Sequence, residues 1–135
     1  MKLKAIFFFI VLIVLLLIFA TKREKSSGSE WIDVKLSMDE LKRIQCDVDN
    51  GHFPGYLDPE NVVYEFACSN HFIIKDKSKV HCKKISNNRE LFCSLSLVGG
   101  KILETILFKP VRQDSTGIWV VKSYRIKKEL FKIPF

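Results

Sequence analysis

The sequence predicts an α+β protein: an N-terminal transmembrane helix, then two helices packed on a four-stranded antiparallel sheet. Three observations lead to this fold class. Residues 5–20 form an unbroken apolar run, residues 37–70 carry apolar side chains at helical spacing, and later segments up to residue 126 alternate with a period of two. After the run about 115 residues remain, which suffices for one small domain and excludes a second catalytic domain, a TIM barrel or a multi-span transporter.

The apolar run AIFFFIVLIVLLLIFA at residues 5–20 contains no charge, proline or glycine. Extended by Thr21, it forms a helix of about 25 Å, the short end of the range for membrane spans. Ile18 stands where a signal peptidase prefers a small residue, so we expect residues 1–21 to be retained as an anchor or uncleaved signal. Lys2 and Lys4 favour a cytoplasmic N-terminus and a C-terminal domain outside the cell membrane. Cleavage and secretion are the alternative.

Residues 22–35 follow as a flexible basic linker, because this stretch begins with charged residues, serines and a glycine and has little to bury. The small extracytoplasmic α+β domain then occupies residues 36–135. The first helix of this domain begins after Ser37, which forms a capping box with Glu40. Asn50 and Gly51 supply its end.

The second helix begins at the sequence Asp58-Pro59-Glu60. Asp58 is a favourable N-cap, Pro59 stands where no backbone N–H is needed, and Glu60 places an acid at the positive end of the helix dipole. Its packing face consists of Val62, Val63, Phe66 and Ala67.

The sheet begins with a hairpin around a two-residue turn at Asn87-Asn88, since asparagine tolerates positive φ. This register places Val80 opposite Leu95 and Cys82 opposite Cys93, with the apolar side chains on one face. Turns at residues 99–100 and 114–117 lead into strands at 102–108 and 118–126, which completes a four-stranded meander.

The hairpin register also brings Cys82 and Cys93 within reach of a disulfide. Two reduced thiols in the core are the alternative, and Cys46 and Cys68 are expected to be buried free thiols. No metal or cofactor is predicted, because His81 and Cys82 are neighbours on a strand and point to opposite faces. No nucleophile, zinc-protease or phosphate-loop motif occurs, so the sequence favours a protein that is not an enzyme.

The net charge of +7 indicates an anionic partner. Basic side chains recur at every second residue along one segment, and in a strand they share one face. That basic face consists of Lys75, Lys77, Lys79, His81 and Lys83. It suits anionic lipid headgroups or cell-wall polymer, whereas few aromatic residues interleave as nucleic-acid binding would require. The alternative is a solvated strand face that blocks edge pairing.

A second candidate site is a pocket between the helices and the sheet. His52 lies in a loop bounded by glycines and rich in aromatic residues, and Tyr56 and Trp119 are the other candidates for its lining. For His52, a hydrogen bond that braces the loop is the alternative role.

Two short blocks carry a resemblance to known proteins. They are DVDNGHFP at residues 47–54, which leads into Asp58-Pro59, and GIWVV at residues 117–121. The chain resembles small exported or membrane-anchored proteins of Gram-positive bacteria whose function is uncharacterised. Its order of helices followed by a meander is similar to that of NTF2-like domains, which implies a curved sheet over a pocket. The resemblance implies a fold and a location, and no catalytic residue.

These observations favour a membrane-anchored extracytoplasmic binding or scaffolding module that contacts anionic lipid or wall polymer through the basic face. Two alternatives stay open. One is a pocket protein that binds a small ligand and could be an enzyme, with His52, Tyr56 and Trp119 near the cavity. The other is an accessory subunit that has a protein partner in an envelope complex.

Overall fold

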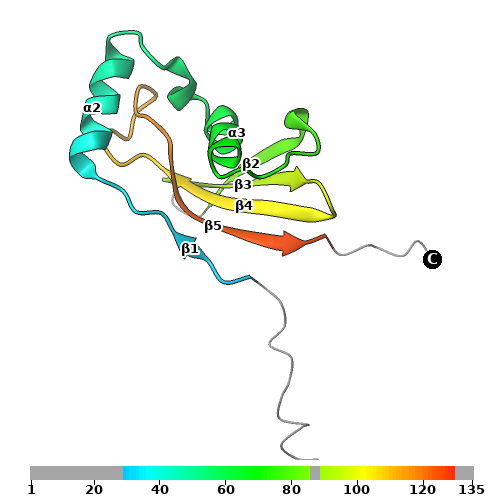
Figure 1. The fold of residues 1–135 in the computed structure, drawn as a ribbon. Helices are drawn as coiled ribbons and strands as arrows, with labels where there is room; N and C mark the ends of the chain where they lie inside the picture. Colours follow the sequence, from blue (N-terminus) through cyan, green and yellow to red (C-terminus); the bar gives the residue numbers. More distant parts are fainter. Residues whose placement is uncertain (1–28, 86–88, 130–135) are drawn as a thin grey trace, which may run out of the picture.

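The computed structural model describes residues 29–85 and 89–129 (Figure 1). Its centre is a five-stranded antiparallel sheet in the order β1-β5-β4-β3-β2. The strands are β1 (Ile32–Asp33), β2 (Val80–Lys84), β3 (Glu90–Leu97), β4 (Lys101–Phe108) and β5 (Val120–Lys128). The helices are α2 (Met38–Asp49) and α3 (Pro59–Ser69), with short 3-10 helices at Pro54–Leu57 and Lys77–Lys79.

The prediction of four strands is wrong, because β1 adds a fifth at the edge beside β5. This strand lies inside the segment 22–35 that the sequence marked as a flexible linker. With two residues in its ladder, β1 is too short to show a period in the sequence. The Val34 N–H extends the pairing by donating to the Lys122 carbonyl oxygen at 2.9 Å.

The predicted transmembrane helix at residues 1–21 lies outside the described residues, as does the predicted turn at Asn87-Asn88. In the ranges 29–85 and 89–129, neither helix is long and apolar enough to cross a membrane.

Both helices begin where their capping residues predict. The Ser37 hydroxyl accepts the Glu40 N–H at 3.5 Å, and a carboxylate oxygen of Asp58 accepts the Glu60 N–H at 3.0 Å. Pro59 is the first residue of α3. These contacts satisfy backbone donors that the first turn of a helix leaves unpaired.

The hairpin register is confirmed. Val80 pairs with Leu95 and Cys82 with Cys93, and β3 alternates buried and half-buried residues along its length. The buried side chains face α3, which covers this side of the sheet (Figure 1). On α3, Val63 and Ala67 are completely buried against the strands. Apolar burial of this kind is the main source of the domain's stability.

Helix α2 does not pack on the sheet as predicted. It lies beyond one end of the strands, against the loop between β4 and β5 (Figure 1). There Leu41 and Val48 form a separate small cluster with Ile118 of the loop. The apolar stripe of α2 was read correctly from the sequence, but its partner is a loop about seventy residues away in the chain, which no local pattern identifies.

Candidate ligand-binding groove

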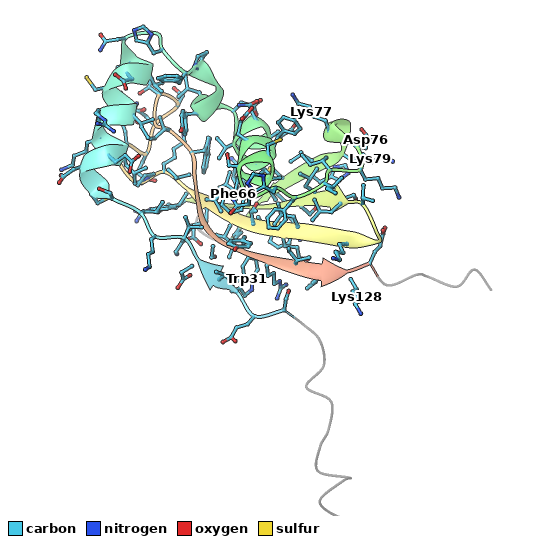
Figure 2. The ribbon with its side chains drawn as sticks, in the orientation of Figure 1. Trp31, Phe66, Asp76, Lys77, Lys79 and Lys128 are labelled. Atoms are coloured by element: carbon cyan, nitrogen blue, oxygen red, sulfur yellow. A yellow bond between two sulfur atoms is a disulfide. The ribbon has the colours of Figure 1, made fainter. Side chains whose placement is uncertain are left out.

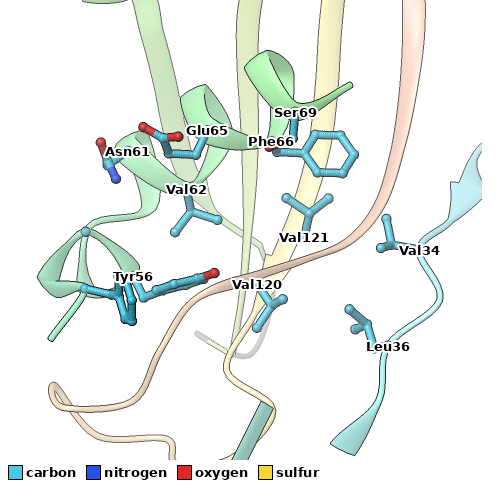
Figure 3. Close-up of a pocket in the computed structure, with 12 residues that line it drawn as sticks. Val34, Leu36, Tyr56, Asn61, Val62, Glu65, Phe66, Ser69, Val120 and Val121 are labelled. Carbon is cyan, nitrogen blue, oxygen red and sulfur yellow. The ribbon is translucent and has the colours of Figure 1, made fainter. Parts of the chain in front are cut away.

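An open groove of about 480 Å³ lies between α3 and the extended segment that joins β1 to α2 (Figure 3). The 3-10 helix Pro54–Leu57 and the start of β5 complete its walls. Most of the lining is apolar and includes Val34, Leu36, Val62, Phe66, Val120 and Val121. An apolar concavity of this size is the usual form of a small-ligand site.

The groove follows the boundary between the two apolar clusters. Val34, Val62 and Phe66 belong to the cluster under α3, whereas Leu36 and Val120 pack with the α2 cluster. The groove exists because α3 and α2 each cover a different part of the molecule, and the boundary between them is left open.

Tyr56 packs against both clusters and forms one wall of the groove. Its hydroxyl is directed toward the segment that leads into β5 (Figure 3). The Trp119 N–H donates to the Tyr56 carbonyl oxygen at 2.8 Å, so the loop that ends in β5 fixes the backbone of this residue.

Gly55, beside Tyr56, approaches α3 closely. A Cβ atom at this position would lie 2.3 Å from the side-chain nitrogen of Asn61. A side chain on residue 55 would therefore displace Asn61, which is itself part of the lining. The glycine thus leaves room for the Asn61 side chain at this end of the groove.

Phe53 is the most exposed apolar member of the lining, with 63% of its surface accessible. Its backbone is left-handed, with φ 49° and ψ 51°. That conformation is uncommon for an aromatic residue, and the residue before a proline is normally extended. Such strain concentrates at binding sites, where the surrounding structure holds a side chain in a required position. Here the strained residue adds an aromatic side chain to the lining of the groove.

The polar groups of the groove lie along one side, on α3. Asn61, Glu65 and Ser69 follow one another at four-residue spacing, so they share a stripe of the helix. Figure 3 shows the Asn61 amide and the Glu65 carboxylate close together above Val62. Among the residues that the structure describes, Glu65 is the only charged one in the lining. The groove therefore offers an apolar surface with one carboxylate at its edge.

Of the three residues predicted to line a pocket, the structure places Tyr56 in the groove. Trp119 supports it through the backbone, and its ring lies 4.8 Å from the Lys109 ammonium. His52 is exposed and lies outside the lining, with its ring centroid 6.4 Å from that of Phe53.

The sequence interpretation missed Glu65 and Phe53. The helical spacing of Asn61, Glu65 and Ser69 beside the apolar stripe Val62 and Phe66 is the signal that would have pointed to this polar edge. The conformation of Phe53 has no comparable signal, because it arises from the surrounding fold.

The predicted basic face is not a single surface. Strand β2 begins only at Val80, and Lys77–Lys79 is a 3-10 helix, so the alternation expected for an extended strand is lost. The Lys77 ammonium lies 4.0 Å from the ring centroid of Tyr64 on α3, whereas that of Lys83 lies 5.2 Å from the ring of Phe92 on the opposite face of the sheet.

The remaining members of the basic set are all exposed. Lys79 lies 3.8 Å from the carboxylate of Asp76, while His81 shares the face of Lys83 by strand alternation. Lys75 precedes the 3-10 helix. The five basic residues are thus divided between two sides of the domain (Figure 2 shows Lys77 and Lys79).

The Cys82 and Cys93 sulfur atoms are joined in a disulfide, 2.01 Å apart, on the face that α3 covers. The bond ties the edge strand β2 to its neighbour β3. Of the two alternatives for this pair, the structure has the disulfide rather than two reduced thiols. Cys46 and Cys68 are free thiols but exposed, which corrects the expectation that they are buried. Both occupy the outer sides of their helices.

No match to the chain is found among protein families, curated proteins or solved structures. The resemblance to exported Gram-positive proteins stays a prediction.

Proposed function

We propose that this protein is a binding module whose groove takes a small amphipathic ligand with an apolar body and a protonated amine. The observation that carries the proposal is the position of Glu65, the one charge that the described part of the chain places at the edge of a largely apolar groove. The apolar segment at residues 5–20 supports a place at the cell membrane, with the domain outside.

The size and shape of the groove support a small ligand. Its volume of about 480 Å³ falls within the range of drug-sized sites, and it is open along one side. Binding would remove the exposed ring of Phe53 and the valines of β5 from water, at about 25 cal/mol per Å² of apolar surface. The affinity would thus come mainly from the apolar body.

The carboxylate of Glu65 gives the groove its preference for an amine. The protein as a whole is basic, with a net charge of +7, and attracts anions. The groove departs from this because the lining formed by residues 29–85 and 89–129 holds an acid and no lysine or arginine. An exposed ion pair contributes at most about 1 kcal/mol, so an amine is preferred over a matched alcohol by about fivefold.

The test uses the full chain in lipid nanodiscs, with 3-fluorotyrosine as a fluorine NMR probe of Tyr56. Phenylbutylamine, phenylbutanol and phenylbutyrate are titrated as ligands that differ only in the polar group. We expect the Tyr56 resonance to shift with each, with affinity in the order amine, alcohol, carboxylate. Empty nanodiscs correct for partition into lipid.

Glu65→Gln is the decisive variant, and we expect it to bring amine and alcohol to equal affinity. Glu60→Gln, in the first turn of α3 and outside the lining, is the matched control and keeps the preference. Phe53→Gly weakens all three ligands because it removes an aromatic part of the lining. If the Tyr56 resonance responds to none of the ligands, or if Glu65→Gln leaves the order unchanged, the proposal is wrong.

A further inference from the structure

We propose that one end of the sheet, formed by the turn between β3 and β4 and the segment beside it, contacts the surface of an anionic bilayer. Two apolar side chains protrude there. Ile73 and Val98 are 72% and 52% exposed, and the Val98 N–H donates to the Ile73 carbonyl oxygen at 2.9 Å. They form an exposed apolar pair, which we call the apolar tip.

Exposed lysines surround the apolar tip. The Lys75 N–H donates to the Ser96 carbonyl oxygen at 3.1 Å, which fixes this lysine beside the end of β3. Lys101 follows the turn directly and pairs with Lys128 across β4 and β5 (Figure 2 labels Lys128). Across the ranges that the structure describes, none of the three forms an ion pair.

The charge balance at this end favours an anionic partner. The acids nearest in the chain are Asp76, which lies 3.8 Å from the ammonium of Lys79, and the exposed Glu129. Lys101 and Lys128 stand directly opposite each other, an arrangement that costs stability because like charges repel. A layer of phosphate groups relieves that repulsion, whereas water and salt only screen it.

The course of the chain places this end toward the N-terminal apolar segment. Since β1 runs antiparallel to β5, the residues before it lie beside the last part of β5, where the Ser29 hydroxyl donates to the Ile126 carbonyl oxygen. Only residues 21–28 separate Ser29 from the apolar run, a length of at most about 28 Å. The C-terminal hexapeptide LFKIPF, which contains four apolar residues and one lysine, also continues from this end.

A bilayer fits these features better than a protein does. Two protruding side chains are too few for a stable protein interface, which buries about 800 Å² on each partner. Small apolar groups surrounded by lysines match the boundary between acyl chains and anionic headgroups. This inference is independent of the groove.

The experiment measures how deeply the apolar tip enters lipid. A nitrobenzoxadiazole label is attached at Val98→Cys in a Cys46→Ser/Cys68→Ser background, and the full chain is reconstituted into vesicles that contain spin-labelled lipid. We expect strong quenching and a blue-shifted emission when phosphatidylglycerol is present, and weak quenching in phosphatidylcholine alone. Because the quencher is in both leaflets, the result does not depend on the orientation of the chain.

The matched control carries the label on the native Cys46 of α2, with Cys68→Ser, and stays unquenched in both lipids. Lys101→Gln/Lys128→Gln weakens the contact by roughly fivefold per lysine removed. Near-ultraviolet circular dichroism verifies that each variant is folded. Equal quenching at the two labelled positions, quenching at position 98 that ignores phosphatidylglycerol, or failure of the chain to associate with vesicles would overturn the proposal.

Discussion

Helices α3 and α2 are held to the molecule by different means. Helix α3 packs on the sheet through apolar side chains, and both Val63 and Ala67 are completely buried. The buried face of α2 contains two apolar residues and a glutamine, and it contacts mainly the loop between β4 and β5. The comparison shows that one part of the fold is fixed by the hydrophobic effect, and the other by the matching of individual polar groups.

The polar contacts of α2 centre on Gln45, which is only 2% exposed. Its amide nitrogen donates to the Thr116 carbonyl oxygen at 2.9 Å, and its amide oxygen accepts the Ile118 N–H at 3.0 Å. At the next turn of the helix, both oxygens of Asp49 accept from Arg112, at 2.8 and 3.0 Å. The bonds of Gln45 satisfy backbone groups of the loop, and together with the Asp49–Arg112 pair they fix the position of the loop relative to α2.

The loop is shaped for this contact by a close approach of its backbone. A Cβ atom on Gly117 would lie 1.8 Å from the carbonyl oxygen of Arg112, so only glycine fits there. Trp119, which holds Tyr56 and one wall of the groove, follows two residues later. The stability of α2 and the shape of the groove are therefore linked through one loop.

The largest difference between the two regions is expected from removing a leucine from each. Leu95→Ala, in the core under α3, should lower the free energy of unfolding by about 4 kcal/mol, because the packed strands cannot close the cavity. Leu41→Ala should cost about 2 kcal/mol, since the α2 cluster is small and can relax. Urea unfolding followed by tryptophan fluorescence measures both, with Ile73→Ala at an exposed site as the control. Equal losses would show that the two clusters form a single core.

The sequence predicted the parts of the fold that depend on local patterns. The alternation of β3 and the caps at Ser37 and Asp58 are local, and the structure confirms them. The position of α2 depends on Gln45 reaching a loop far along the chain, and no periodicity marks such a contact. The sequence did not predict strand β1 for a related reason, because its two residues are a strand only by pairing with β5.

The features of the candidate site likewise divide into those that the sequence can predict and those that depend on the fold. Tyr56 could be predicted because it lies in a loop with glycine, proline and aromatic neighbours, a common setting for binding residues. The division of the basic face between two sides could not be predicted, since a 3-10 helix at Lys77–Lys79 interrupts an alternation that the sequence shows without a break. Phe53 owes its place in the groove to a backbone conformation that is unfavourable in isolation.

A smaller but more local effect is expected from Gln45→Leu. Leucine has nearly the volume of glutamine but can neither donate to the Thr116 carbonyl oxygen nor accept from the Ile118 N–H. The Ile118 N–H is then left buried without an acceptor. We expect a loss of about 2 kcal/mol, with faster amide exchange in α2 and at Ile118 while β3 is unaffected. Lys42→Leu, on the exposed side of the same helix, should change stability by less than about 0.5 kcal/mol. Faster exchange throughout the sheet would contradict the separation of the two regions.

The smallest expected effect concerns the ion pair at the end of α2. Hydrogen bonds from Arg112 and then from Gln45 hold the pKa of Asp49 below its ordinary value. Since the folded-state pKa is lowered, the stabilisation is complete above the unfolded pKa of about 3.9 and is lost as the pH falls through the folded value.

Thermal unfolding of the parent and of Asp49→Asn between neutral and acidic pH measures this contribution. Asparagine keeps one acceptor oxygen for Gln45 and Arg112, but its amide nitrogen cannot accept the second hydrogen bond from Arg112, so the variant removes the charge together with that bond. We expect the parent to be the more stable protein at neutral pH and the difference to shrink below pH 4. Asp114, whose pKa is lowered by hydrogen bonds from Thr116, titrates in both proteins, so its contribution cancels in the difference between their stabilities. A difference that persists into strong acid would show that α2 is held there by the geometry of the hydrogen bonds and not by the charge of the carboxylate.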